Sequence, residues 1–212
     1  MSGSRHPGGH VLVVDDTTMD RQVLARAVGR LGYEVTTAPD GDAALDVLRA
    51  RDGEAAHVDV VLLDLMMPGR DGFDTLREIK ADDALARIPV IVVSAVEDHD
   101  SLIRCIELGA TDYLYKPFDR ELLRVRLATS LASKRLRDVE LDHLLQVERV
   151  IGAATALEAG DYDSRPLEPV AQRDDALGTL ARVFDQMARE VQAREAELRR
   201  AVDALRIEID RG

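Results

Sequence analysis

Up to about residue 128, short apolar runs alternate with stretches in which apolar residues recur every three or four positions. The first pattern predicts buried strands and the second predicts amphipathic helices. Strands are expected at 11–14, 33–37, 58–63, 89–93 and 113–115, and helices at 17–31, 40–51, 73–81, 100–108 and from 119 onward. Uninterrupted apolar strands that alternate with helices are typical of a parallel sheet covered on both faces. We therefore expect an α/β domain with a doubly wound, five-stranded parallel sheet.

Polar side chains stand directly at the ends of four of these strands. Asp15 and Asp16 follow the first strand, Asp64 the third, Ser94 the fourth and Lys116 the fifth. Sites in doubly wound sheets form outside the carboxyl ends of the strands. We therefore expect three carboxylates, one hydroxyl and one ammonium to converge at one edge of the sheet.

This combination of side chains indicates a metal-assisted phosphoryl site. Three close carboxylates repel one another unless a cation lies among them. Because no His or Cys accompanies them, we expect a hard cation, and Mg²⁺ fits since it binds through carboxylates and leaves positions open for water and phosphate. A carboxylate beside Mg²⁺ and a lysine can attack a phosphoryl group and form an aspartyl phosphate. The metal and the ammonium would stabilise charge on the transferring oxygens.

Four sequence motifs surround these residues. They are VLVVDD at 11–16, LLDLMMPGRDG at 62–72, VVSA at 92–95 and GATDYLYKPF at 109–118. Together they resemble the response-regulator receiver domain of two-component signalling. The resemblance implies a flavodoxin-like receiver fold over residues 10–132, preceded by a flexible tail at 1–9.

The resemblance also implies a role for each site residue. Asp64 would accept a phosphoryl group from a histidine kinase or a phosphotransfer protein, and Lys116 would assist. Asp15, Asp16, Asp64 and the backbone carbonyl of Met66 would hold Mg²⁺. Ser94 would sense the phosphate, Tyr113 would be the switch aromatic, and the Lys116–Pro117 bond would be cis.

Simpler explanations exist for each of these residues taken alone. An aspartate at a strand end is commonly a turn or helix-capping residue, Ser94 alone would be a cap, and Lys116 alone would be solvated. Five such residues on adjacent strand ends favour one common site. An aspartyl-phosphate hydrolase is a poor match, because the D-x-D spacing of those enzymes is absent where Thr17 follows Asp15 and Asp16.

Composition and charge narrow the class of protein and its partners. The 212 residues carry a net charge of −12, so we expect neither nucleic acid nor an anionic membrane surface as a partner. Residues are 46% hydrophobic and 3% aromatic, which predicts a folded, aliphatic core. The chain has neither a run of about 20 apolar residues nor a secretion signal, so a cytoplasmic protein is expected. The single cysteine, Cys105, excludes an intrachain disulfide.

Beyond the predicted receiver, the sequence becomes helical in pattern. No proline interrupts residues 119–159, which predicts a helix about 60 Å long. One apolar stripe on it comprises Leu141, Leu144, Val147, Ile151 and Ala154. Residues 160–173 contain two prolines and predict an extended connector. A second helix carries a heptad seam with a stutter near 194–202 and one polar member, Arg194; its members are Leu177, Leu180, Phe184, Met187, Val191, Arg194, Leu198, Val202, Leu205 and Ile209.

Two such helices have too little core to fold alone. Two copies side by side would form a parallel four-helix bundle, which predicts a homodimer through residues 133–212. The sequence from about 141 to 191 resembles a HAMP signalling domain, and the residues that carry the resemblance lie at 152–191. They are Gly160-Asp161, an apolar connector residue (Leu167 or Val170) and Asp175-Ala176-Leu177-Gly178, in which Ala176 replaces the family's Glu. We assign 133–191 to a helical extension with this HAMP-like domain and 192–212 to a coiled-coil helix. A plain antiparallel hairpin or a dimerisation stalk is the alternative.

These features predict a two-component response regulator that relays phosphorylation at Asp64 through a dimeric HAMP-like bundle to an output beyond this chain. Its chemistry would be limited to self-catalysed phosphoryl transfer and autodephosphorylation, so it is not expected to be a conventional enzyme. A phosphorylation-independent dimeric scaffold is the alternative. No basic recognition helix follows residue 130, which disfavours a transcription factor. Because the seam runs to the last residues, Arg211-Gly212, the sequence leaves open whether the chain is part of a longer protein with an effector beyond it.

Overall fold

The computed structural model describes residues 8–50, 58–95 and 99–209, and the side chains of 207–209 are outside this description. The chain divides into two compact units, residues 1–137 and 138–212, and the boundary lies within one long helix. The tail expected at 1–9 lies almost wholly outside the described residues. No helix in the described part of the chain is both long enough and apolar enough to cross a membrane.

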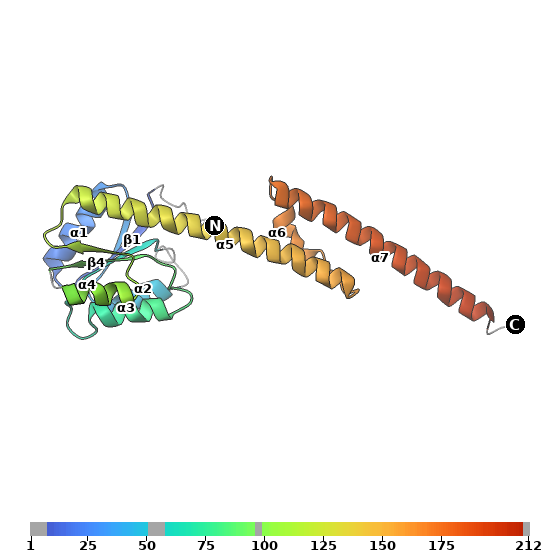
Figure 1. Cartoon of the computed structure of the whole chain (residues 1–212), viewed down its shortest axis with the longest axis horizontal. Helices are drawn as coiled ribbons and strands as arrows, with labels where there is room; N and C mark the ends of the chain where they lie inside the picture. Colours follow the sequence, from blue (N-terminus) through green and yellow to red (C-terminus); the bar gives the residue numbers. More distant parts are fainter. Residues whose placement is uncertain (1–7, 51–57, 96–98, 210–212) are drawn as a thin grey trace. The chain divides into compact units, whose positions relative to one another are not determined.

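A five-stranded parallel sheet forms the centre of the first unit (Figure 1). Its strand order is β2-β1-β3-β4-β5. The strands are β1 (His10–Val14), β2 (Glu34–Ala38), β3 (Val60–Leu63), β4 (Val90–Ser94) and β5 (Asp112–Tyr115). The predicted doubly wound α/β fold is therefore confirmed, with strand boundaries that differ from the expected ones by one or two residues.

Helices cover both faces of this sheet because successive strand residues point to opposite sides. Leu12 and Val14 pack in the layer with α2 (Gly41–Arg49), α3 (Gly72–Ala81) and α4 (His99–Glu107). Val11 and Val13 pack in the layer with α1 (Thr18–Arg30) and the first part of α5 (Arg120–Glu158). Every residue of β1, β3 and β4 is buried, so this sheet holds its site-bearing edge on a rigid, aliphatic core.

Aspartate caps define where two of the helices begin. The Asp40 side chain accepts a hydrogen bond from the backbone N–H of Ala43 at 2.8 Å, just before α2. The Asp71 side chain accepts one from the N–H of Asp74 at 2.7 Å, just before α3. Such caps satisfy backbone donors that the first helical turn leaves unpaired. The cap at Asp71 also ends the loop that leaves the carboxyl end of β3.

The second unit contains the end of α5 and the helix α7 (Ala176–Ile209), which run in the same direction (Figure 1). Asp142, early in this part of α5, pairs with Arg173 just before α7 at 2.8 Å. Tyr162, just after α5, donates its hydroxyl to Asp185 within α7 at 2.7 Å. Contacts therefore follow the same order along both helices, which is the parallel arrangement and not the antiparallel hairpin.

The connector between these helices is folded and not extended, so that expectation was wrong. Residues Arg165–Leu167 form a 3₁₀ turn and Glu168–Ala171 form the short helix α6. Each has a proline near its start, where proline is compatible with a helix because the first N–H groups need no intrahelical partner. Leu167 and Val170, three positions apart, are both buried in the core of the second unit.

Side chains of α5 and α7 pack inside the second unit along a narrow strip. Its members from α5 are Val150, Ala153 and Leu157, and those from α7 are Leu177, Ala181, Phe184 and Ala188. Most of the predicted stripe and seam points away from this strip and is exposed in the single chain: Leu144, Ile151, Leu180, Met187, Val191, Leu198, Val202 and Leu205. The unit therefore buries one apolar face and leaves another uncovered.

Candidate functional site

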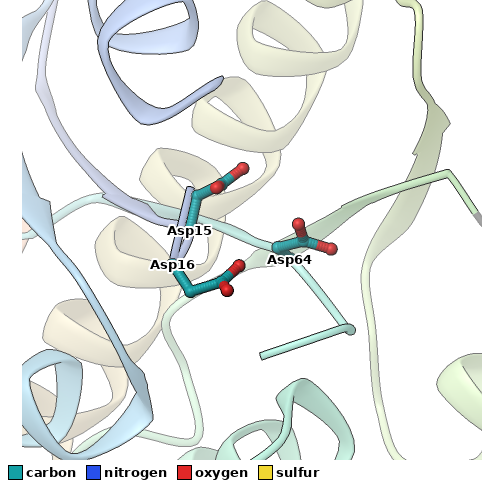
Figure 2. Close-up of side chains that lie close together, drawn as sticks. All are labelled: Asp15, Asp16 and Asp64. Atoms are coloured by element: carbon teal, nitrogen blue, oxygen red, sulfur yellow. The ribbon is translucent and has the colours of Figure 1, made fainter. Parts of the chain in front are cut away.

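Three aspartates lie together at the carboxyl edge of the sheet (Figure 2). Val14 and Leu63 are register partners in β1 and β3, so the residues that follow them are brought side by side. The backbone N–H of Asp64 donates to the carbonyl of Val14 at 2.9 Å, which extends this pairing past the strand ends. Each of Asp15, Asp16 and Asp64 offers a carboxylate oxygen, and these oxygens lie within 4.8 Å of one another.

The Lys116 ammonium lies between two of these carboxylates. Its Nζ is 2.7 Å from Oδ2 of Asp15 and 2.7 Å from Oδ2 of Asp64. The backbone N–H of Lys116 donates to the carbonyl of Ser94 at 3.0 Å, and the Lys116–Pro117 bond is cis, as the resemblance implies. Lys116 thus follows β5, is bonded through its backbone to the end of β4, and reaches the aspartates with its side chain.

Burial and charge shift the ionisation of this ion pair. Burial raises the pKa of the Asp15 carboxyl above its usual value, against the opposing effect of its hydrogen bond with Lys116. Burial also lowers the pKa of the Lys116 ammonium, but hydrogen bonds to Asp15 and Asp64 outweigh it and hold this pKa above its usual value. Lys116 is therefore charged at neutral pH and balances one of the negative charges around it.

Backbone hydrogen bonds hold the carboxylates in place. The N–H of Thr17 donates to Oδ1 of Asp15 at 2.8 Å, and the N–H of Met66 donates to Oδ1 of Asp64 at 3.2 Å. Gly72 packs against the backbone at Asp64, where a Cβ would lie 2.2 Å from the Asp64 carbonyl oxygen. Only glycine allows this approach, which fixes the start of α3 beside the acidic edge.

The remaining predicted residues lie near this edge in different ways. Ser94 ends β4 and is fully buried, whereas the Met66 side chain is exposed in the loop two residues after Asp64. Tyr113 lies in β5 opposite Val92, and its ring is 4.7 Å from the ring of Tyr115. The structure therefore brings the Lys116 ammonium into direct contact with Asp15 and Asp64 and groups Asp16 with these carboxylates. It places Tyr113 two residues before the end of β5, against the core layer of α2 to α4.

Two neighbours of the site were missed in the sequence. Asp20 in the first turn of α1 lies 3.4 Å from the Lys116 ammonium, measured to its Oδ2. Arg21 donates from Nη1 to the backbone carbonyl of Asp15 at 2.6 Å and to that of Asp16 at 3.3 Å. Their position in the first turn after a site-bearing strand is the signal that could have identified them.

The donor set fits a magnesium ion. The available ligands are the carboxylate oxygens of Asp15, Asp16 and Asp64, and oxygen ligands are those that this hard cation prefers. Lys116 supplies a single positive charge against Asp15, Asp16 and Asp64, so a divalent cation would remove the remaining repulsion. The part of the chain that the structure describes offers no His or Cys within this cluster.

Comparisons with known proteins agree with this geometry. The family model of the response regulator receiver domain matches residues 11–128. Response regulator PleD of Caulobacter vibrioides is 35% identical over 188 residues, which cover 89% of this chain and 37% of that protein. Probable transcriptional regulator ycf27 of Cyanidium caldarium is 35% identical over 132 residues, covering 62% of this chain and 50% of that protein. The chain thus spans half or less of the length of these relatives.

Solved structures show the same fold for the first unit. Chemotaxis protein CheY4 of Vibrio cholerae is 30% identical with a TM-score of 0.53, covering 58% of this chain and 98% of that chain. The receiver domain of sensor histidine kinase PA1611 of Pseudomonas aeruginosa is 32% identical with a TM-score of 0.52, covering 59% of this chain and 98% of that chain. That receiver domain was solved with a magnesium ion coordinated in its active-site cleft.

Proposed function

Because the chain belongs to the response regulator receiver domain family, we propose that it accepts a phosphoryl group on Asp64 from a histidine kinase or phosphotransfer protein. The observation that carries this proposal is the placement of the Asp64 carboxylate, which lies 2.7 Å from the Lys116 ammonium and within 4.8 Å of the Asp15 and Asp16 oxygens. This arrangement provides a nucleophile in contact with a fixed cation and close to two further carboxylates that could bind a metal ion.

The proposed transfer is a displacement at phosphorus. A carboxylate oxygen of Asp64 forms the new O–P bond while the bond from phosphorus to the donor's imidazole nitrogen breaks, and the nitrogen keeps the electron pair. Lys116 stabilises negative charge on the transferring oxygens. Asp15, Asp16, Asp64 and the Met66 carbonyl would hold Mg²⁺, which supplies further charge neutralisation when bound.

Ser94 and Tyr113 are proposed to carry the phosphorylated state away from Asp64. The Ser94 hydroxyl, at the end of the neighbouring strand, would hydrogen-bond a phosphoryl oxygen. Tyr113 would then repack in the layer with α4, and the presentation of α5 would change. These steps depend on the phosphoryl group, so they require Asp64 to be modified.

Labelling with acetyl phosphate tests the phosphoacceptor. The wild-type chain should take up one phosphoryl group in the presence of Mg²⁺ and none in EDTA. Asp64→Asn should abolish labelling because the amide is a poor nucleophile, whereas Asp74→Asn, an exposed aspartate on α3, should leave it unchanged. Intact-mass spectrometry reads each result. An unlabelled wild-type chain would contradict the proposal and favour the phosphorylation-independent scaffold.

The second unit is proposed to be a HAMP-like relay that works as a homodimer. Two features support this: α5 and α7 run in the same direction, and each leaves an apolar stripe exposed in the single chain. Two copies would cover these stripes in a parallel four-helix bundle. Because α5 belongs to both units, a change at the receiver would be passed into the bundle and along α7. It would then reach the segment predicted as a coiled coil, residues 192–212.

A further inference from the structure

Residues 65–71 form the loop that carries the Met66 carbonyl, a proposed magnesium ligand. Its two ends are tied together, because the N–H of Gly72 donates to the Leu65 carbonyl at 2.9 Å. The Met67 side chain is buried in the core layer below it. These contacts hold the part of the loop that faces the core, at Leu65 and Met67. They do not hold the part that follows Pro68, which we call the outer side of the loop.

Arg70 holds the outer side of this loop. Its Nε donates to Oδ1 of Asp42, in the first turn of α2, at 2.7 Å. Its Nη1 donates to Oε2 of Glu78 in α3, and Arg49 donates to the other oxygen of Glu78 at 2.9 Å. One guanidinium therefore joins the loop to both neighbouring helices.

The stem of Arg70 lies close to the start of α2. A Cβ on Gly41, the first residue of α2, would lie 2.1 Å from Oγ1 of Thr75 and 2.9 Å from Cδ of Arg70. A side chain at this position would displace Thr75 and the arginine stem, so glycine leaves the space that both occupy. A single exposed ion pair contributes little, but a planar guanidinium bonded to carboxylates on two elements restricts both distance and direction.

We propose that Arg70 is a positioning residue for the metal site. Arg70 itself would not contact the magnesium ion, but it would keep the Met66 carbonyl directed at that ion. This inference rests on the proposed function, since it takes Asp15, Asp16 and Asp64 as the carboxylate ligands. Arg70 is two residues from Gly72, whose N–H is bonded to the Leu65 carbonyl, so releasing Arg70 would loosen residues 68–71 and, through that hydrogen bond, the backbone next to Met66. Magnesium affinity would then fall while the carboxylates stay in place.

Calorimetric titration of Mg²⁺ into the full chain measures the effect. Arg70→Gln should weaken magnesium binding roughly tenfold, the size expected when a group that orients a metal ligand is removed. Arg77→Gln is the matched control, because Arg77 lies near the same surface but pairs with Asp74 within its own helix. The control should bind Mg²⁺ within about twofold of wild type, as expected for a surface pair.

Two further measurements separate positioning from general destabilisation. Glu78→Gln should also weaken magnesium binding. The double variant should bind Mg²⁺ no more weakly than Arg70→Gln alone, because both substitutions remove the same Arg70–Glu78 ion pair. The unfolding midpoint of Arg70→Gln should stay near wild type in EDTA and fall below it in Mg²⁺. Unchanged magnesium affinity in Arg70→Gln, or an equal loss in both conditions, would overturn the inference while acetyl phosphate labelling of Asp64 still stood. A wild-type chain that binds no Mg²⁺ would overturn both.

Discussion

The receiver unit and the helical unit differ in how completely a single chain buries their apolar side chains. In the receiver, both faces of the sheet are covered within one chain, and β1, β3 and β4 have no exposed residue. In the helical unit, a narrow strip around Ala153, Ala181 and Ala188 is buried, while large apolar side chains such as Leu198, 66% exposed, face solvent.

Because of this difference, we expect the stability of the receiver to be independent of protein concentration and that of the helical unit to depend on it. A sheet with helices on both sides buries enough apolar surface in one copy. Two long helices packed through small residues bury little, so their remaining apolar face is available for a second copy. The site is thus built on the unit that buries its core within one chain, and the proposed relay is built on the unit that leaves an apolar face exposed in one chain.

The largest expected effect is in the receiver core. Leu62→Ala removes a fully buried side chain in β3 and should lower the free energy of unfolding by about 3 kcal/mol. Denaturant unfolding should show this loss at every protein concentration. Leu198→Ala is the comparison, and its effect should be small and should depend on concentration. A concentration-dependent loss for Leu62→Ala would contradict the self-sufficiency of the receiver.

The next effect is on association. Leu198→Asp places a charge in the exposed stripe of α7 and should convert the proposed dimer to a monomer, because burying an unpaired carboxylate in a bundle is strongly unfavourable. Ala196→Asp puts the same charge on the same helix outside the stripe and should remain dimeric. Light scattering of both variants gives the mass. Monomeric wild-type chain at all concentrations would remove the basis for the proposed bundle.

The smallest effect is the change in the bundle on activation. Spin labels at Ala196 of each copy, in a Cys105→Ser background, should show a shifted distance distribution when beryllofluoride and Mg²⁺ mimic the phosphoryl group. The same labels on Asp64→Asn should show no shift, because that variant removes the acceptor. Electron paramagnetic resonance measures both distributions. Identical distances with and without the mimic in the wild-type chain would contradict the relay.

Much of the receiver and its acidic edge could be predicted from the sequence. Apolar runs locate the strands, and the rule that sites form at the carboxyl ends of parallel strands predicts that Asp15, Asp64 and Lys116 converge. The same rule does not by itself identify Asp20, although its place in the first turn after β1 is a usable signal, and it gives no indication of Arg70. Their roles depend on how far a side chain reaches to a residue many positions away, such as Asp42 for Arg70.

In the helical unit, the spacing of apolar residues predicts the helices but not how they pack. The three- and four-residue steps correctly predicted two long helices but did not say which apolar positions face each other. In the structure, Val150 and Ala153 pack inward, whereas Leu144 and Ile151 of the predicted stripe are exposed. The two prolines of the connector favour an extended prediction because proline interrupts a helix in its interior. Proline is compatible with the first turn of a short helix, which is where the structure places both of them.

The sequence by itself therefore determined the elements, their order, the parallel sheet and the residue types gathered at its edge, because these follow from local periodicity and general rules of topology. Tertiary structure alone decided that Lys116 lies between Asp15 and Asp64, that Arg70 joins the Met66 loop to two helices, and which helical faces remain uncovered. These features depend on distances between residues far apart in the chain, which no local pattern encodes.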